Sequence, residues 1–146
     1  MQITTLLLKY QGGVSIYVKY LLFIVILTST GYYDYKTKTI PNFVHVLIII
    51  AALIPEFSLI DSLLGLFLLP LPFIITIFIN FNGIGGGDIK LVGAMGFFLG
   101  LEHGLVVVIL ALTLVILKTF VMDKGKNKKV ALGPYFAIGS TIILFL

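Results

Sequence analysis

Long apolar runs, separated by short polar or Gly- and Pro-containing stretches, make up most of this chain. Such runs predict helices, and the clusters between them predict connections. The helices predicted in this way are Ile16–Tyr33, Phe43–Ile54, Leu59–Phe81, Ile89–Leu101, Gly104–Val121 and Ala131–Leu146. The chain is therefore expected to fold as a set of helices.

The composition indicates that these helices lie in a lipid bilayer. The 146 residues are 60% hydrophobic and 11% charged, whereas a soluble domain usually has about 25% charged residues. A spanning helix uses roughly 20 apolar residues, so about six can fit in this length. We predict an all-α, polytopic membrane protein with about six transmembrane helices, forming a single membrane-embedded domain over residues 1–146. The second and fourth helices are short and are expected to begin below the surface or to be shielded by neighbours.

The placement of lysines predicts the orientation. All ten basic residues are lysines. Eight of them lie in or beside the first, third and fifth of the five connections between the predicted helices. Because positive charge gathers on cytoplasmic loops, these connections should face the cytoplasm, with both termini outside a plasma membrane. Lys9 and Lys19 lie on the other side, and they also fit an alternative in which a signal peptide is cut after Gly31. The net charge of +4 is small and confined to a few loops, so a nucleic-acid partner is not expected.

Two aspartates are predicted to lie on the same membrane face. Asp34 ends the first predicted helix; the second crosses outward and the third returns, which brings Asp88 back to that face. A carboxylate near hydrocarbon is costly unless it is paired, hydrated or protonated, so its presence favours a function. If the two meet, repulsion and desolvation keep one proton between them. The ionised carboxylate could then activate water while the protonated one polarises a peptide carbonyl.

Each aspartate also has a simpler interpretation. Asp88 precedes an apolar helix and could be its N-cap, with the glycines before it forming a turn. Asp34 follows a helix, where the helix dipole disfavours an anion, so capping does not explain it. It could instead be a solvated loop acid neutralised by Lys36 and Lys38.

Other reactive side chains are scarce. The chain contains no cysteine, which removes thiol nucleophiles, disulfides and cysteine-based zinc sites. His45 and His103 have no second ligand at metal-binding spacing, so each is interpreted as a satisfied or solvated histidine. No metal and no cofactor are therefore expected.

Three ordered motifs resemble those of the type IV prepilin peptidase family. The stretch from Gly85 to Lys90 contains the Gly-x-Gly-Asp signature of intramembrane aspartyl peptidases and its Ile-Lys extension. Asp34 followed by Ile40-Pro41-Asn42 resembles the first-aspartate motif, and Leu132-Gly133-Pro134-Tyr135 with Gly139 resembles the last-helix motif. The three motifs together cover nearly the whole chain.

The resemblance implies an activity and a site. Asp34 and Asp88 would be the catalytic aspartates, and Gly85 and Gly87 would shape the loop that places Asp88, since glycine permits positive φ and close approach of a peptide. The other motif residues are expected to bind substrate or to shape the site; they are Lys90, Pro41, Asn42, Gly133 and Pro134. The implied substrate is a prepilin or pilin-like precursor, whose short basic leader precedes an apolar helix and is removed at the cytoplasmic face. Gly96-x-x-x-Gly100 would offer that helix a packing face, or serve ordinary packing inside the protein.

Within the family, the chain is most similar to the short Tad-type or archaeal preflagellin peptidases. It lacks the N-terminal extension with paired cysteines of large bifunctional members, so N-methylation is not expected. Presenilin and signal peptide peptidase relatives also pair Tyr-Asp with Gly-x-Gly-Asp, as Tyr33-Asp34 does here, but their Pro-Ala-Leu motif is missing. Two rival functions stay open: a small transporter or channel with paired intramembrane carboxylates, and a catalytically silent partner in pilus assembly.

Overall fold

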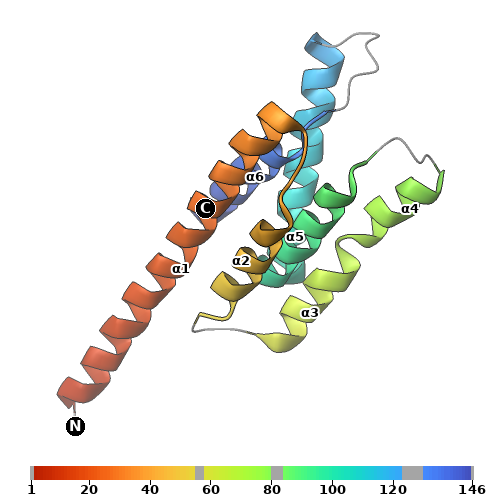
Figure 1. Cartoon of the computed structure of the whole chain (residues 1–146). Coiled ribbons are helices and arrows are strands. Elements are labelled where there is room, and N and C mark those ends of the chain that lie inside the picture. Colours follow the sequence, from red (N-terminus) through yellow and green to blue (C-terminus); the bar gives the residue numbers. More distant parts are fainter. Residues whose placement is uncertain (1, 55–57, 80–83, 123–129, 146) are drawn as a thin grey trace.

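Six helices follow one another along the described part of the chain, residues 2–54, 58–79, 84–122 and 130–145 of a computed structural model (Figure 1). They are α1 (Gln2–Thr37), α2 (Asn42–Ala52), α3 (Leu59–Leu68), α4 (Leu71–Ile79), α5 (Gly86–Met122) and α6 (Gly133–Phe145). No strand occurs in these ranges, which confirms the predicted all-α fold class. The core forms where α5 contacts α2, α3 and α6.

Three stretches of helix in the described residues are long and apolar enough to cross a membrane, which is fewer than the six predicted. They are Gly13–Thr37, Leu59–Ile79 and Gly86–Val121. The second joins α3 and α4, which are separated at Leu69 and Pro70 because proline lacks the amide N–H that a continuous helix needs. The helices α2 and α6 have only 11 and 13 residues, and the predicted fourth and fifth helices are merged in α5.

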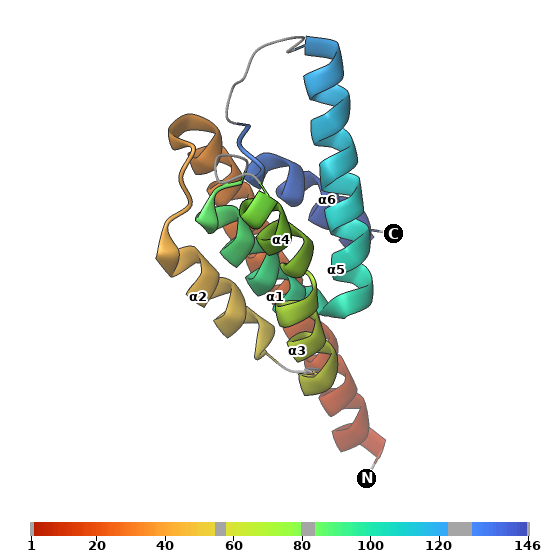
Figure 2. The same cartoon turned by 90° about the vertical axis from the view of Figure 1, so that its right-hand side faces the viewer.

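The merged helix α5 reverses direction at Gly100 (Figures 1 and 2). Gly100 has φ 78° and ψ 178°, a conformation that residues with a side chain rarely adopt. The sequence predicted two helices here, Ile89–Leu101 and Gly104–Val121, connected by Glu102 and His103. The break therefore lies two residues before the predicted connection. Asp61, in the first turn of α3, accepts a hydrogen bond from the Leu101 amide at 3.1 Å. This contact satisfies an amide that the break leaves without an intrahelical partner.

The closest approach of two backbones lies between α3 and the first segment of α5, residues 86–99. A Cβ atom added to Gly65 would overlap the carbonyl group of Gly96, and one added to Gly96 would overlap the carbonyl oxygen of Gly65. Glycine at both positions therefore allows the two helices to touch through their main chains. Of the two alternatives for Gly96-x-x-x-Gly100, packing inside the protein is the one observed: Gly96 contacts α3, and Gly100 makes the break.

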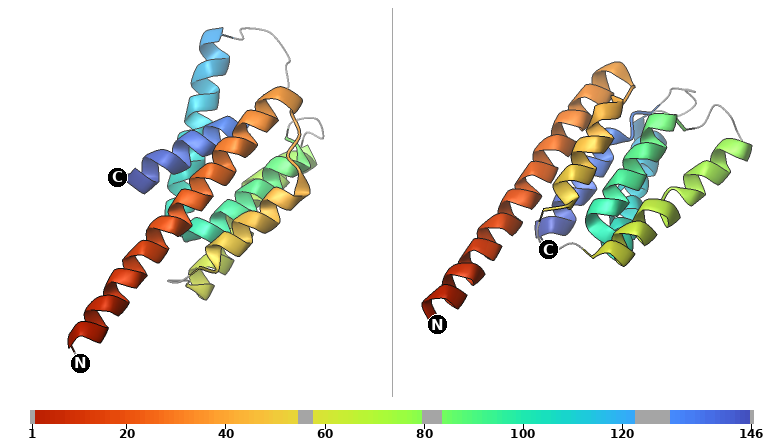
Figure 3. Two further views of the ribbon diagram at one scale, coloured as in Figure 1. Left: turned by 60° about the vertical axis from the view of Figure 1, so that its left-hand side comes forward. Right: turned by 60° about the horizontal axis from the view of Figure 1, so that its bottom comes forward.

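The helices α1 and α2 lie alongside one another, and α6 packs across α1 (Figure 3). Stacked rings of Phe23 and Phe98, with centroids 3.8 Å apart, connect α1 to α5. Lys19 is buried next to them, with its ammonium group 3.4 Å from the carbonyl oxygen of Ile54 and 5.4 Å from the Phe98 ring centroid. Because this carbonyl follows the end of α2, the lysine sits where a helix dipole favours positive charge.

Candidate active site

Asp34 lies in the last helical turns of α1 and is only 3% exposed. Its Oδ2 atom accepts a hydrogen bond of 2.9 Å from the amide of Gly133, the first residue of α6. Amides at the start of a helix lack intrahelical partners and carry partial positive charge, so they suit a carboxylate. Lys36 lies over the ring of Tyr32, 4.6 Å from its centroid. The interpretation of Asp34 as a solvated loop acid is therefore wrong.

The last-helix motif brings the start of α6 against Asp34. A Cβ atom added to Gly133 would lie 2.9 Å from Oδ2 of Asp34 and 3.0 Å from its Cβ. A Cβ added to Gly31, one turn earlier on α1, would lie 3.0 Å from Cα of Pro134. A side chain at Gly31 would crowd the backbone of Pro134, and one at Gly133 would crowd the Asp34 carboxyl group, so glycine at both positions allows α6 to approach α1 closely.

Asp88 is half-buried in the first turn of α5. Its amide donates to the carbonyl oxygen of Gly85 at 3.1 Å, and a Cβ added to Gly85 would lie 3.1 Å from Oδ2 of Asp88. The side chain thus turns back toward the loop that precedes the helix. Because α5 begins at Gly86, Asp88 is inside the first turn and does not occupy the predicted N-cap position, although the helix dipole still favours an anion there.

The link between α1 and α2 connects the surroundings of the two aspartates. Lys38 directly follows the last residue of α1; it has φ 53° and donates its amide to the Asp34 carbonyl oxygen at 2.7 Å. Ile40 then packs on the glycine loop, since a Cβ added to Gly87 would lie 3.3 Å from that of Ile40. Asp34 and Asp88 therefore lie at the same end of the bundle, where α1 ends and α2, α5 and α6 begin.

Polar contacts fasten the start of α2 to the start of α5. Pro41 precedes α2 in an extended conformation, with φ −64° and ψ 140°. The Lys90 ammonium group donates to Oδ1 of Asn42 at 3.2 Å. His45 is 7% exposed and lies between the two helices, with Nδ1 3.1 Å from the Asn42 carbonyl oxygen and Nε2 3.2 Å from that of Gly87. These contacts make the motif residues Asn42 and Lys90 part of the frame that holds the Asp88 loop.

His45 is a residue whose place in this frame sequence reasoning missed. It was interpreted as satisfied or solvated; the structure shows it buried and satisfied, in contact with the residue before Asp88. The available signal was its position one helical turn after Asn42, which puts it on the same face of α2.

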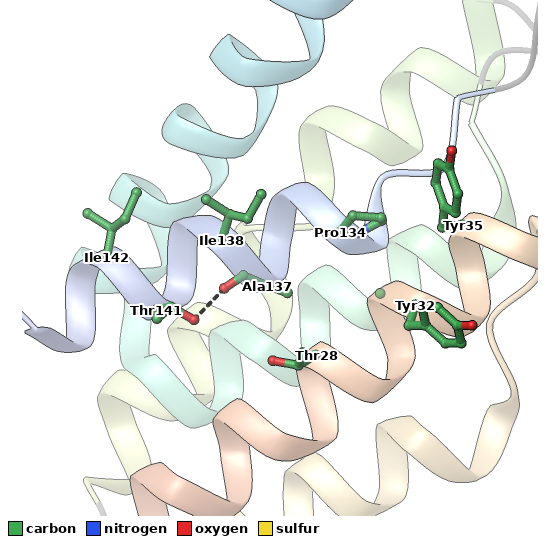
Figure 4. Close-up of a pocket in the computed structure, with 9 residues that line it drawn as sticks. Thr28, Tyr32, Tyr35, Pro134, Ala137, Ile138, Thr141 and Ile142 are labelled. Atoms are coloured by element: carbon green, nitrogen blue, oxygen red, sulfur yellow. Dashed lines mark hydrogen bonds between the residues drawn. The ribbon is translucent and has the colours of Figure 1, made fainter.

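Two apolar grooves are each lined by the residue that follows one aspartate in the sequence, Tyr35 or Ile89. One, of about 480 Å³, runs between α1 and α6, with Tyr32, Tyr35 and Pro134 at one end and Ile142 at the other (Figure 4). Tyr35 and Pro134 adjoin Asp34 and Gly133 in the sequence. A second groove, of about 470 Å³, lies on α5 between α2 and α3; it is lined by Asn42, His45, Ile49, Leu66, Phe67, Pro70, Ile89, Lys90, Gly93 and Ala94. Within the described residues, no group of three or more histidines or acids is placed to hold a metal ion.

A sequence model of the Type IV leader peptidase family matches residues 21–120, more than half of the chain. The chain belongs to the Type IV leader peptidase family. The matched range includes both aspartates, Ile40-Pro41-Asn42 and the Gly-x-Gly-Asp stretch, and it ends before Gly133 and Pro134. No curated protein and no solved structure matches the chain. Membership in this family and the long apolar helices together make the chain a membrane protein.

Most of the site residues implied by the family resemblance are in contact with one another in the structure. Asp34 is paired with Gly133, and Asp88 with Gly85. Lys90 is bonded to Asn42, and Gly87 contacts both Ile40 and His45. Residues from three separate motifs therefore converge at one end of a helical bundle, which is the arrangement that a site built from distant parts of a chain requires.

Proposed function

We propose that this family member is an aspartyl endopeptidase of the plasma membrane that removes the basic leader from type IV prepilin-like precursors. In this proposal Asp34 and Asp88 are the catalytic pair, and the cut is made at the cytoplasmic face. The observation that carries the proposal is the convergence of their surroundings: the link that follows Asp34 packs on the glycine that precedes Asp88. Burial of Asp34 against the start of α6 supports a role beyond solvation.

The proposed chemistry needs one proton shared by the two carboxylates. Water attacks the carbonyl carbon of the scissile peptide and gives a proton to the ionised carboxylate, while the protonated carboxylate donates to the carbonyl oxygen. The C–N bond of the tetrahedral intermediate then breaks, and a proton passes to the leaving amine. The products are a free carboxyl group on the leader and a free amine on the mature chain, and the pair again holds one proton.

Gly86, two residues before Asp88, is exposed and leaves open space at the start of α5. A Cβ added to Gly86 would meet nothing within 4 Å, so the space beside this glycine is open. Each apolar groove is lined by a residue next to one aspartate in the sequence, Tyr35 or Ile89, and could hold an apolar segment that follows the cut. The lysine distribution supports an orientation in which this end of the bundle faces the cytoplasm, together with the basic leader of the precursor.

Leader removal by the purified protein tests this function. Protein in detergent micelles is mixed with a prepilin-like precursor, and the products are analysed by mass spectrometry. We expect one cut that separates the basic leader from the apolar helix, and no cut by the Asp34→Asn/Asp88→Asn double variant. Micelles support no ion gradient, so a transporter or a silent assembly partner would leave the precursor intact. A folded protein that leaves every prepilin-like precursor of a broad panel intact would overturn the proposal.

A further inference from the structure

The side chain of His45 makes a polar contact between α2 and the start of α5, and the hydrogen bond from Lys90 to Asn42 is another. Its ring lies between α2 and the first turn of α5, and both ring nitrogens face carbonyl oxygens, of Asn42 at 3.1 Å and of Gly87 at 3.2 Å. Carbonyl oxygens only accept hydrogen bonds, and a neutral imidazole donates one. The contact with Asn42 lies within three residues of the histidine, whereas the contact with Gly87 spans 42 residues. A neutral ring can make only one of these two bonds, and the one from Nε2 is the bond that would link α2 to the start of α5.

The carbonyl group of Gly87 belongs to the same planar peptide unit as the amide of Asp88. A hydrogen bond that holds this oxygen therefore also holds the orientation of the peptide plane. That plane contains the Cα of Asp88, from which the side chain extends. The start of α5 benefits from such a restraint, because Gly85 precedes the helix, Gly86 and Gly87 are its first two residues, and glycine has access to many backbone conformations. Ile40 restrains Gly87 sterically from the other side, but it offers no directional bond.

We propose that His45 is a positioning residue for Asp88: its Nε2–H donates to the Gly87 carbonyl and sets the peptide unit that carries the aspartate. This inference rests on the proposed function for its effect on catalysis, but its effect on the loop does not depend on that function. Asn42 supports the same frame, since its side-chain Oδ1 accepts a hydrogen bond from Lys90.

Three substitutions separate this role from simple filling of space. The side-chain amide of Gln reaches about as far as Nε2 and can donate to Gly87, whereas that of Asn reaches only about as far as Nδ1. Leu fills the volume and donates nothing. We expect kcat for leader removal to fall between about tenfold and 100-fold in His45→Leu and His45→Asn, because small displacements of a reacting group have effects of this size. KM should change little, and His45→Gln should recover most of kcat.

His103→Leu is the matched control, because this histidine is exposed and lies beyond the break in α5; its kcat should equal that of the wild type. Equal kcat in His45→Asn and wild type would overturn the proposal. So would equal losses in His45→Gln and His45→Leu, which would indicate a role in packing.

Hydrogen exchange measured by mass spectrometry gives a readout that needs no activity. Exchange in the peptide that contains Gly87 and Asp88 should speed up in His45→Leu and His45→Asn and stay near the wild-type rate in His45→Gln. If the wild type cleaves no precursor, the proposed function fails, while the exchange rates still decide whether His45 holds the loop. Unchanged exchange in all three variants would overturn the positioning role.

Discussion

We expect Asp34→Asn and Asp88→Asn each to lower the rate of leader removal by about 10³-fold, and the double variant to be no slower than the slower of the two single variants. An asparagine side chain neither takes a proton from water nor returns one to the leaving amine. In the proposed mechanism the two carboxylates share one proton, so loss of either one disables the pair and the second substitution causes no further loss of rate. Initial rates with purified variants and a saturating precursor measure the effect.

Asp61→Asn is the matched control for these variants. Asp61 lies at the far end of the first segment of α5, where its Oδ1 accepts from the Leu101 amide, and asparagine keeps an acceptor at that atom. The control should fold and cleave like the wild type. A double variant whose loss equals the product of the two single losses would show that Asp34 and Asp88 act independently, and the shared-proton mechanism would then be wrong.

Gly65→Ala destabilises the protein by about 3 kcal/mol, at the upper end of the effect of overpacking. The new methyl group would overlap the backbone carbonyl of Gly96, which cannot rotate away as a side chain can. The helix α3 must then move off the segment of α5 that begins next to Asp88. Unfolding in detergent, followed by circular dichroism, measures the change.

Gly13→Ala provides the comparison for this substitution. A Cβ at Gly13 meets nothing within 4 Å, and alanine favours a helix more than glycine does, so this variant should be at least as stable as the wild type. A Gly65→Ala protein as stable as Gly13→Ala would contradict the close approach of α3 and α5.

Apolar runs located most helices, and the motifs located the aspartates. The start and end of α2 and α6 were predicted within about two residues, because Pro41 and Pro134 mark helix starts that sequence rules recognise. The break at Gly100 was placed two residues late, since Glu102 and His103 are the polar residues there and Gly100 follows an apolar run. The separation of α3 from α4 was missed because Pro70 and Pro72 lie in an uninterrupted apolar stretch.

Contacts between distant residues were the part that the sequence could not supply. Asp61 was placed inside a long predicted helix, and nothing near it in the sequence indicates that it accepts from Leu101, 40 residues away. The hydrogen bond from Gly133 to Asp34 spans 99 residues. Before the structure, only the family resemblance connected the motif of Asp34 with the motif of Gly133. The resemblance did not predict which atoms of the two motifs are in contact. The orientation, the single domain over residues 1–146 and the roles of the site residues stay predictions.

Crosslinking of two cysteines placed at the aspartates tests most directly whether Asp34 and Asp88 form one site. The chain contains no cysteine of its own, so Asp34→Cys/Asp88→Cys can be treated in membranes with a short bifunctional thiol reagent and the bridged product identified by mass. Asp34→Cys/Asp61→Cys is the control, because Asp61 lies about 20 Å from Asp88 along α5 at 1.5 Å per residue. Rapid bridging of the 34/88 pair and none of the 34/61 pair is the predicted result. A 34/88 pair that bridges no faster than the 34/61 pair would contradict a shared catalytic site.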